Sequence, residues 1–344
     1  MRSWSKSSIL KNKWCQFFSV ACTAGSLGYA VAKYQSSVND HTSIKTSGIQ
    51  NDGWSCQNFK DDGICSRFPS SLFPQISAAT KVQDSLITRT EDLVSEPSHE
   101  SPRITQIMRY GFPSLTNVRS LDDFVISYDT RTRIPHWVFE HLTAQNVAKN
   151  DTVDRSKSDF HEDGSIHDYF RSTNQDYKRS GYDRGHMAAA GNHRLNQRHC
   201  DQTFLLSNMA PQVGRGFNRD KWNELEHHCR QLTRKSRNVY VCTGPLFLPR
   251  SEDDGNLYVK YRVLGSNHVA VPTHFFKVLL IESESRDMHL ESYLLPNAAI
   301  ESSTPLSTFL VPVEVIERAS GLLLFDKINK VKFKTVNGKS IGWF

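Results

Sequence analysis

Apolar and polar positions follow one another after residue 104 in patterns that predict a mixed α/β domain. The apolar runs at residues 124–129 and 135–142 are separated by a turn-prone segment and predict a β-hairpin. Residues 149–179 are polar and have no strong period, which predicts a long surface segment. Residues 203–212 are mostly apolar and reach a proline, so we expect a strand that leads into a loop.

The clearest helical pattern lies in residues 218–235. An apolar stripe repeats there at the spacing of one helix face, through Trp222, Leu225, Cys229 and Leu232. Asn218 is placed to cap the start of this helix. A second helix is expected in residues 311–325, closed by Gly321. Between the two helices we expect three more strands, in residues 238–248, 268–282 and 288–296.

The first 35 residues have the composition of a targeting segment. Residues 1–39 contain five basic residues and no acid, so they carry +5 of the net charge of +6. Basic and serine-rich residues before an apolar run at 14–32 are typical of a mitochondrial presequence, and that run would also serve as a membrane anchor. Small residues at 30–32 fit the cleavage site of a secretory signal peptide, which leaves secretion as an alternative.

The rest of the chain divides into three parts by composition. Residues 36–103 are rich in Ser, Asp, Asn, Thr and Gln, which predicts a disordered linker. Residues 104–325 carry the regular patterns of a folded domain, and residues 326–344 form a basic tail that we expect to be a solvated extension. Two of the seven cysteines lie in the targeting segment, and the other five form an odd set without close pairs. This set predicts no disulfide framework and argues against secretion.

The stretch SGYDRGHMAAAGNHR, at residues 180–194, places a base beside a fixed cation. The pKa of a free histidine lies near physiological pH, so His186 is suited to take a proton from a water. Arg184 keeps its charge and offers two donors to a phosphate. Gly185 would allow a tight backbone path and close approach of substrate, while Asp183 would orient Arg184 or a backbone group. These residue types are what hydrolysis of a phosphodiester requires.

A divalent metal would complete such a site, and Asn218 is its best candidate ligand. A neutral oxygen donor leaves Mg²⁺, or Mn²⁺ in its place, with most of its waters. Glu226 lies on the same predicted helix, about 12 Å further along the axis, so we expect it to contact the metal's waters. The alternatives are that Asn218 only caps the helix and that Glu226 only pairs with Arg230 at the surface.

Basic residues gather around the same stretch. Five cations between residues 178 and 198 oppose the single acid Asp183. Contacts to phosphate explain this group better than structural pairing does. We therefore expect Arg179 and Arg194 to bind the backbone of DNA or RNA without regard to its sequence.

Three motifs in order, DRGHMAAAGN, FLLSNMAPQ and NRDKWNELE, resemble the ββα-metal (His-Me finger) nucleases that cut DNA and RNA non-specifically. The resemblance covers about residues 104–325 and is closer to the mitochondrial members of the family. It implies an α+β fold with a central, mainly antiparallel sheet flanked by helices, and an endonuclease that depends on Mg²⁺. It also implies a homodimer, with mitochondrial inner-membrane association through the N-terminal segment.

The same resemblance assigns roles to residues of this chain. His186 would be the general base, Arg184 a phosphate-stabilising group, Asn218 the metal ligand and Glu226 a helper in the metal's water shell. Asn208 matches a supporting polar position.

The chain departs from the family's pattern at two positions. His161 stands where a basic residue is usual, and Ser158 stands where a cysteine is usual. These changes put the strength of substrate binding and the pH dependence of activity in question. Two alternatives stay open from the sequence: a catalytically weak, nucleic-acid-binding or regulatory member of the fold, and a secreted nuclease that salvages nutrients.

Overall fold

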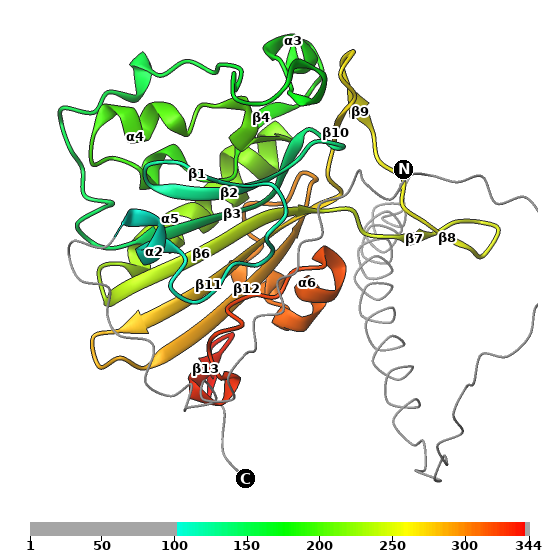
Figure 1. Ribbon diagram of the computed structural model, residues 1–344. Coiled ribbons are helices and arrows are strands. Elements are labelled where there is room, and N and C mark those ends of the chain that lie inside the picture. The colour runs from blue at the N-terminus through cyan, green and yellow to red at the C-terminus, as the bar shows by residue number, and fades with distance from the viewer. Residues whose placement is uncertain (1–101, 341–344) are drawn as a thin grey trace, which may run out of the picture. The chain divides into compact units, whose positions relative to one another are not determined.

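The structure is a computed structural model and describes residues 102–340 (Figure 1). The predicted targeting segment, the linker up to residue 101 and the first four cysteines lie outside the described residues. The three remaining cysteines, Cys200, Cys229 and Cys242, are free and buried. Within residues 102–340, no helix has the length and apolar character needed to cross a membrane.

The described elements belong to one large sheet, three small sheets and short helices. The large sheet contains β1 Val118–Ser120, β2 Phe124–Asp129, β3 Ile134–Leu142, β6 Ser236–Leu246, β11 His274–Ser283, β12 Met288–Pro296, β13 Phe333–Val336 and β14 Lys339–Ser340. The small sheets pair β4 Asp183–His186 with β5 Met209–Gln212, β7 Arg250–Ser251 with β8 Leu257–Tyr258, and β9 Val263–Leu264 with β10 Val269–Ala270. The α-helices are α2 Arg103–Ile107, α3 Asn174–Tyr177, α4 Gln197–Gln202, α5 Asn223–Leu232 and α6 Val313–Ser320.

The remaining elements are short 3₁₀ turns and one longer π-helical segment. Short 3₁₀ turns are η2 Arg155–Lys157, η3 Asp168–Phe170, η4 Ala190–Asn192, η5 Leu206–Asn208, η7 Leu306–Phe309 and η8 Lys330–Lys332. The segment η6 Gly214–Trp222 has π-helical turns and runs directly into α5.

The eight-stranded sheet forms the middle layer of the fold, in the order β1-β2-β3-β6-β11-β12-β13-β14 (Figure 1). Every pair is antiparallel except β12 with β13. The predicted central, mainly antiparallel sheet is therefore confirmed. The predicted hairpin is β2 with β3, and the three later strand predictions overlap β6, β11 and β12.

Helices cover both faces of this sheet, which is why β6 and β11 are buried along almost their whole length. On one face, Leu225 and Cys229 of α5 pack into a core with the inward side chains of the sheet. On the other face, Ile107 of α2 and Ile316 of α6 pack into a second core. α6 ends at Gly321, whose φ of 72° is the left-handed conformation that closes the predicted helix.

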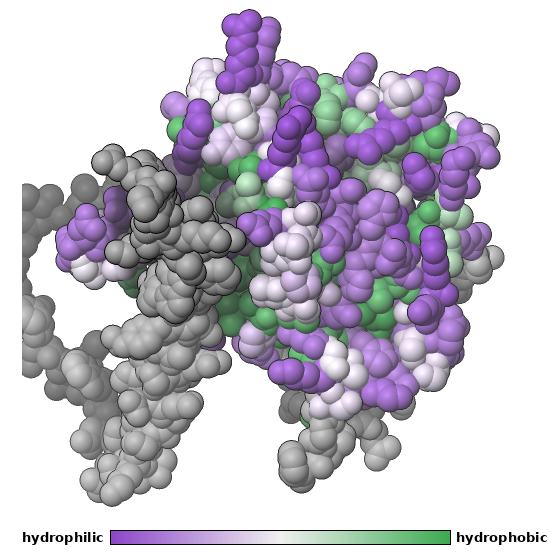
Figure 2. Space-filling view, turned by 180° about the vertical axis from the view of Figure 1, so that it is seen from behind, coloured by the Kyte–Doolittle hydropathy of each residue, from purple (hydrophilic) through white to green (hydrophobic). Residues whose placement is uncertain are grey.

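One face of the domain is mainly polar. Figure 2 shows one face on which hydrophilic side chains predominate and hydrophobic ones appear in separate small areas. The described residues bury their apolar side chains in the two cores on either side of the sheet and in a smaller cluster of Ala190, Cys200 and Phe204.

Two local predictions are wrong in detail. Residues 203–212 are not one strand, because the chain first makes the 3₁₀ turn η5 and only then enters β5. The predicted helix of residues 218–235 begins as π-helical turns, after a kink at Arg215 and Gly216. Asn218 lies inside these turns and is not a cap, since its backbone N–H donates to the carbonyl of Val213 at 2.9 Å.

The expectation of a solvated extension after residue 325 is wrong for part of that tail. β13 pairs in parallel with β12, and the side chain of Phe333 is buried in the core that contains Ile316. Apolar residues among the lysines of the tail thus add an edge to the sheet.

Candidate active site

A cleft of about 1010 Å³ opens on the face of the molecule that carries α3, β4 and α5. The lining includes seven of the residues predicted from the sequence: Arg179, Asp183, Arg184, His186, Arg194, Asn218 and Glu226. The other two predicted residues, Gly185 and Asn208, do not line it. Residues that are far apart in the chain therefore meet in one cleft.

The local scaffold of the cleft is a two-stranded ribbon followed by a helix. β4 and β5 pair antiparallel, with His186 opposite Met209 and Asp183 opposite Gln212. The chain then passes through η6 into α5. This arrangement brings Asp183 at the start of β4 next to Asn218 in η6.

His186 lines the cleft and packs against two aromatic rings that also contact each other. The centroid of its ring is 5.5 Å from that of Phe160 and 4.9 Å from that of Phe204. Its Nε2 is buried and has no hydrogen-bond partner among the described residues. Burial, followed by the charges of Arg155 and Arg184, lowers the pKa of His186 to about 3. The imidazole is therefore neutral at physiological pH, with one ring nitrogen free of a proton.

Arg184 is fixed over an aromatic ring beside this histidine. Its guanidinium carbon lies 4.1 Å from the ring centroid of Phe160, and its Nη1 donates to Oδ1 of Asn174 at 2.5 Å. A guanidinium held in this way keeps its other donors for a ligand. The prediction that Asp183 orients Arg184 is wrong, because the carboxylate of Asp183 binds other groups.

Asp183 orients Asn218 and Arg219. Its carboxylate accepts two hydrogen bonds from Arg219, at 2.8 and 2.6 Å, and one from Nδ2 of Asn218 at 3.0 Å. The hydrogen bond with Arg219 is the main cause that holds the pKa of Asp183 below its usual value, so this group is an ionised acceptor. An acceptor on this side requires the amide nitrogen of Asn218 to face Asp183 and leaves the amide oxygen available to a cation.

Glu226 lies in the cleft and not on an outer helix surface. Burial raises the pKa of its carboxyl to about 7, against the opposing effect of Lys277 and Arg230. Within residues 102–340 no ion pair joins Glu226 to Arg230, and Nη1 of Arg230 donates instead to Oδ1 of Asn192 at 2.9 Å. The interpretation of Glu226 as half of a surface pair is therefore wrong. A positive ion in the cleft would favour the ionised form of this carboxyl.

Gly185 and Asn208 support the site from behind. A Cβ on Gly185 would lie 2.1 Å from the side-chain oxygen of Gln212, so this glycine allows β4 and β5 to pack and does not provide space for substrate. Asn208 is buried. Its Oδ1 accepts a hydrogen bond from the backbone N–H of Ala188, and its Nδ2 donates to the backbone carbonyls of Ala188 and Thr203. Asn208 thus holds the segment that follows His186.

Several residues that line the cleft were not predicted from the sequence: Arg155, Phe160, Asn174, Arg219 and Arg230. Arg155 and Asn174 come from the long polar segment, whose letters carry no periodic signal. Of the basic group near the motif, Arg198 pairs with Asp122 at 2.7 Å and does not line the cleft.

The two departures from the family pattern lie beside the cleft rather than in it. His161 is exposed, and Ser158 donates to Asp201 at 2.6 Å. Neither residue lines the cleft.

A strand pair and helix that carry a neutral histidine, an asparagine and a carboxylate in a basic cleft define a ββα-metal nuclease. The chain belongs to the DNA/RNA non-specific endonuclease family, whose model matches residues 104–331. It is 48% identical to the mitochondrial endonuclease G of Caenorhabditis elegans, over 79% of this chain and 90% of that protein. It is 53% identical to the mitochondrial endonuclease G of Homo sapiens, over 65% of this chain and 74% of that protein.

A solved structure agrees with this assignment. A crystal structure of the EndoG/EndoGI complex, described as showing the mechanism of EndoG inhibition, matches with a TM-score of 0.70 and 64% identity. The match covers 72% of this chain and all of that chain. The predicted fold class, nuclease activity and mitochondrial location are confirmed, and the enzyme is a metal-dependent hydrolase of nucleic acids.

Proposed function

We propose that this protein is a Mg²⁺-dependent endonuclease in which His186 activates the attacking water. The observation that carries the proposal is a neutral histidine in the same basic cleft as the amide of Asn218 and the carboxyl of Glu226. The substrates are DNA and RNA, cut with little preference for sequence.

The residues of the cleft fit a hard divalent ion. The amide oxygen of Asn218 is turned away from Asp183, and a single neutral oxygen ligand suits Mg²⁺, or Mn²⁺, that keeps most of its waters. Glu226 would accept hydrogen bonds from those waters. When bound, the ion supplies positive charge for the phosphate and for the departing oxygen.

Proton transfer falls to His186. Since Nε2 is buried, Nδ1 is the nitrogen that meets a water in the cleft, and it accepts that water's proton as the oxygen attacks phosphorus. Arg184, fixed by Asn174 and Phe160, donates to the phosphate oxygens on which charge develops. The buried position of His186 keeps the ring unprotonated before each turnover.

Substrate binding falls to the cations of the cleft. Arg155, Lys178, Arg179, Arg184, Arg194, Arg219 and Arg230 line it, against only two acids, Asp183 and Glu226. We expect these cations to contact phosphates, which DNA and RNA share, and contacts to phosphate carry no sequence information.

Two parts of the proposal rest on the sequence and the family resemblance alone. They are a homodimer and an association of the N-terminal segment with the mitochondrial inner membrane. Sedimentation of the purified protein tests the first, with a single monomeric species as the contrary result. Residues 1–39 fused to a fluorescent reporter test the second, and secretion of the reporter would contradict it.

The base is tested by His186→Ala in the purified full-length protein. We expect the rate on supercoiled plasmid and on single-stranded RNA to fall by about 10²–10⁴-fold, because a positioned general base contributes this much. Activity of the unchanged protein should vanish in EDTA and return with Mg²⁺. The matched control is His136→Ala, since His136 contacts the carbonyl of Ser320 on the α6 side of the sheet. Full activity of folded His186→Ala would reject the role.

A further inference from the structure

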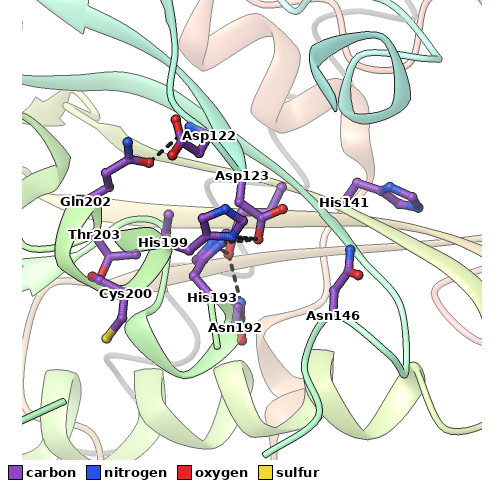
Figure 3. A network of polar contacts seen from close by, with 12 residues as sticks. Asp122, Asp123, His141, Asn146, Asn192, His193, His199, Cys200, Gln202 and Thr203 are labelled. Carbon is purple, nitrogen blue, oxygen red and sulfur yellow. Dashed lines mark hydrogen bonds and ion pairs between the residues drawn. The ribbon is translucent and has the colours of Figure 1, made fainter. Parts of the chain in front are cut away.

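A line of buried polar side chains runs from the sheet to the cleft. His193 is completely buried, with Nδ1 2.7 Å from Asp123 and Nε2 3.0 Å from Oε1 of Glu140 (Figure 3). Asp123 in turn accepts from Arg103 of α2 at 2.7 Å. Burial opposes a charge on His193, but the two carboxylates outweigh it and raise the pKa of His193 to about 9. The imidazolium is therefore the counter-ion of two buried acids.

Asn192 connects this line to the cleft. Its Nδ2 donates to Oε1 of Glu140 at 2.8 Å, and its Oδ1 accepts from Nη1 of Arg230 at 2.9 Å. Asn192 is itself only 1% exposed, while Arg230 lines the cleft. Figure 3 shows Asp123, His193 and Asn192 grouped together, with dashed lines along the contacts. One buried amide therefore joins a strand of the sheet to a cation of the site.

The surroundings leave Arg230 little freedom. A Cβ on Gly191 would lie 3.1 Å from Nη1 of Arg230, so the guanidinium lies directly against the backbone of η4. A free arginine loses much rotational entropy when it binds a phosphate, and a guanidinium that is already held loses less. The amide of Asn192 can hold Arg230 only while its other end is fixed on Glu140.

We propose that Asn192 is a positioning residue, which Glu140 and His193 hold from the sheet side so that it fixes the guanidinium of Arg230 in the cleft for substrate phosphate. The inference rests on the proposed binding of phosphate by the cations of the cleft. The proposal goes beyond that binding because Asn192 does not contact the substrate. It acts by linking the sheet to the side chain of Arg230 on α5.

A double-mutant cycle tests the proposal. In full-length protein that carries His186→Ala, the affinity for a short DNA duplex is measured over a series of KCl concentrations for Asn192→Ala, Arg230→Ala and the double variant. Arg230→Ala should weaken binding about tenfold and reduce the slope of log K against log salt by about 0.9, the value for one phosphate contact. Asn192→Ala should reproduce part of both effects and add nothing once Arg230 is gone.

Asn238→Ala is the matched control. Asn238 is also a buried asparagine, which donates to Glu282 at 2.8 Å and lies 2.7 Å from His141, and it does not line the cleft. A purely structural role for Asn192 would lower the melting temperature as this control does and leave the salt slope unchanged, which would overturn the proposal. Additive effects of Asn192→Ala and Arg230→Ala would overturn it too. Cleavage by His186→Ala at the rate of the unchanged protein would instead count against the proposed base, so the two failures are distinguishable.

Discussion

Asp183 links the two sides of the cleft although its carboxylate contacts no reacting group. It holds Arg219 with two hydrogen bonds and turns the amide of Asn218 so that the oxygen is available to a metal. The residue beside the base in the sequence thus acts on the ligand and not on the base. Its role in the enzyme is to orient the side-chain amide of Asn218.

Asp183→Asn should weaken the binding of Mg²⁺ without removing its ligand, Asn218. An amide in place of the carboxylate loses the ion pair with Arg219 and no longer dictates which end of Asn218 faces the cleft. We expect the Mg²⁺ concentration for half-maximal cleavage to rise by about 10–100-fold. A Mg²⁺ titration of plasmid nicking measures this.

The control for this variant is Asp122→Asn. Asp122 forms a similar ion pair with Arg198, at 2.7 Å, but neither residue lines the cleft. An equal rise in both variants would show that the effect is not local to Asn218.

At the scale of elements, the kink that precedes α5 decides where Asn218 lies. Gly216 has a φ of +81°, and a Cβ there would lie 2.9 Å from both Cα and Cβ of Ala299. Its N–H also donates to Asp220 at 2.6 Å. A turn that only glycine adopts easily, packed against a neighbouring loop, therefore starts the π-helical segment.

Gly216→Ala should destabilise the fold by about 1–3 kcal/mol, because it combines left-handed strain with a clash. For a domain of this size, that loss lowers the melting temperature by about 2–12 °C. The comparison variant is Gly181→Ala, where φ is +87° but a Cβ would meet nothing within 4 Å. Equal melting temperatures in the two variants would contradict the role of the Ala299 contact. Calorimetry of both proteins decides the matter.

Elements with a strong local pattern were predictable from the sequence, and elements made by distant contacts were not. The stripe through Trp222, Leu225 and Cys229 predicts α5 because its period is that of a helix. The π-helical start escapes such an argument, since it depends on packing against Ala299. The partners of Asp183 were mispredicted for a similar reason: Arg219 is a neighbour only after β4 meets η6.

The site shows the same division. His186, Arg184, Asn218 and Glu226 could be proposed because they lie in motifs with a chemical meaning. Arg155 approaches His186 closely enough to lower its pKa, yet it comes from a segment with no pattern. Only the fold brings these parts together.

At the scale of the whole molecule, the positive charge is concentrated rather than spread. The first 39 residues carry +5 of the net +6, which leaves only +1 for residues 40–344. The cleft nevertheless has seven cations against two acids. Residues 102–340 have a formal net charge of +5, and the cations of the cleft account for all of it. The rest of these residues is neutral in sum, so a nucleic acid is drawn to the cleft instead of the domain at large.

The pH dependence of stability follows from two groups whose pKa is raised in the folded protein. The pKa of His193 is raised from 6.5 to about 9, so its contribution is complete below pH 6.5 and is lost as pH rises through about 9. The pKa of Glu226 is raised from 4.5 to about 7, so its contribution is lost earlier, as pH rises through about 7. We expect the urea midpoint of unfolding to fall across both windows.

The two contributions can be separated with Glu226→Gln. This variant should lose the fall between about pH 4.5 and 7 and keep the fall between about pH 6.5 and 9. A midpoint that stays constant from pH 7 to pH 9 in both proteins would contradict the charged state assigned to His193.

The parallel pairing of β13 with β12 has a consequence for the order of folding. The strands from β1 to β12 can all pair in antiparallel order as the chain becomes available, but β13 joins only after η7 and α6 have crossed over. Until then β12 is an unpaired edge, and its backbone can pair with another copy of the chain. β13 is thus the strand that covers this edge of β12.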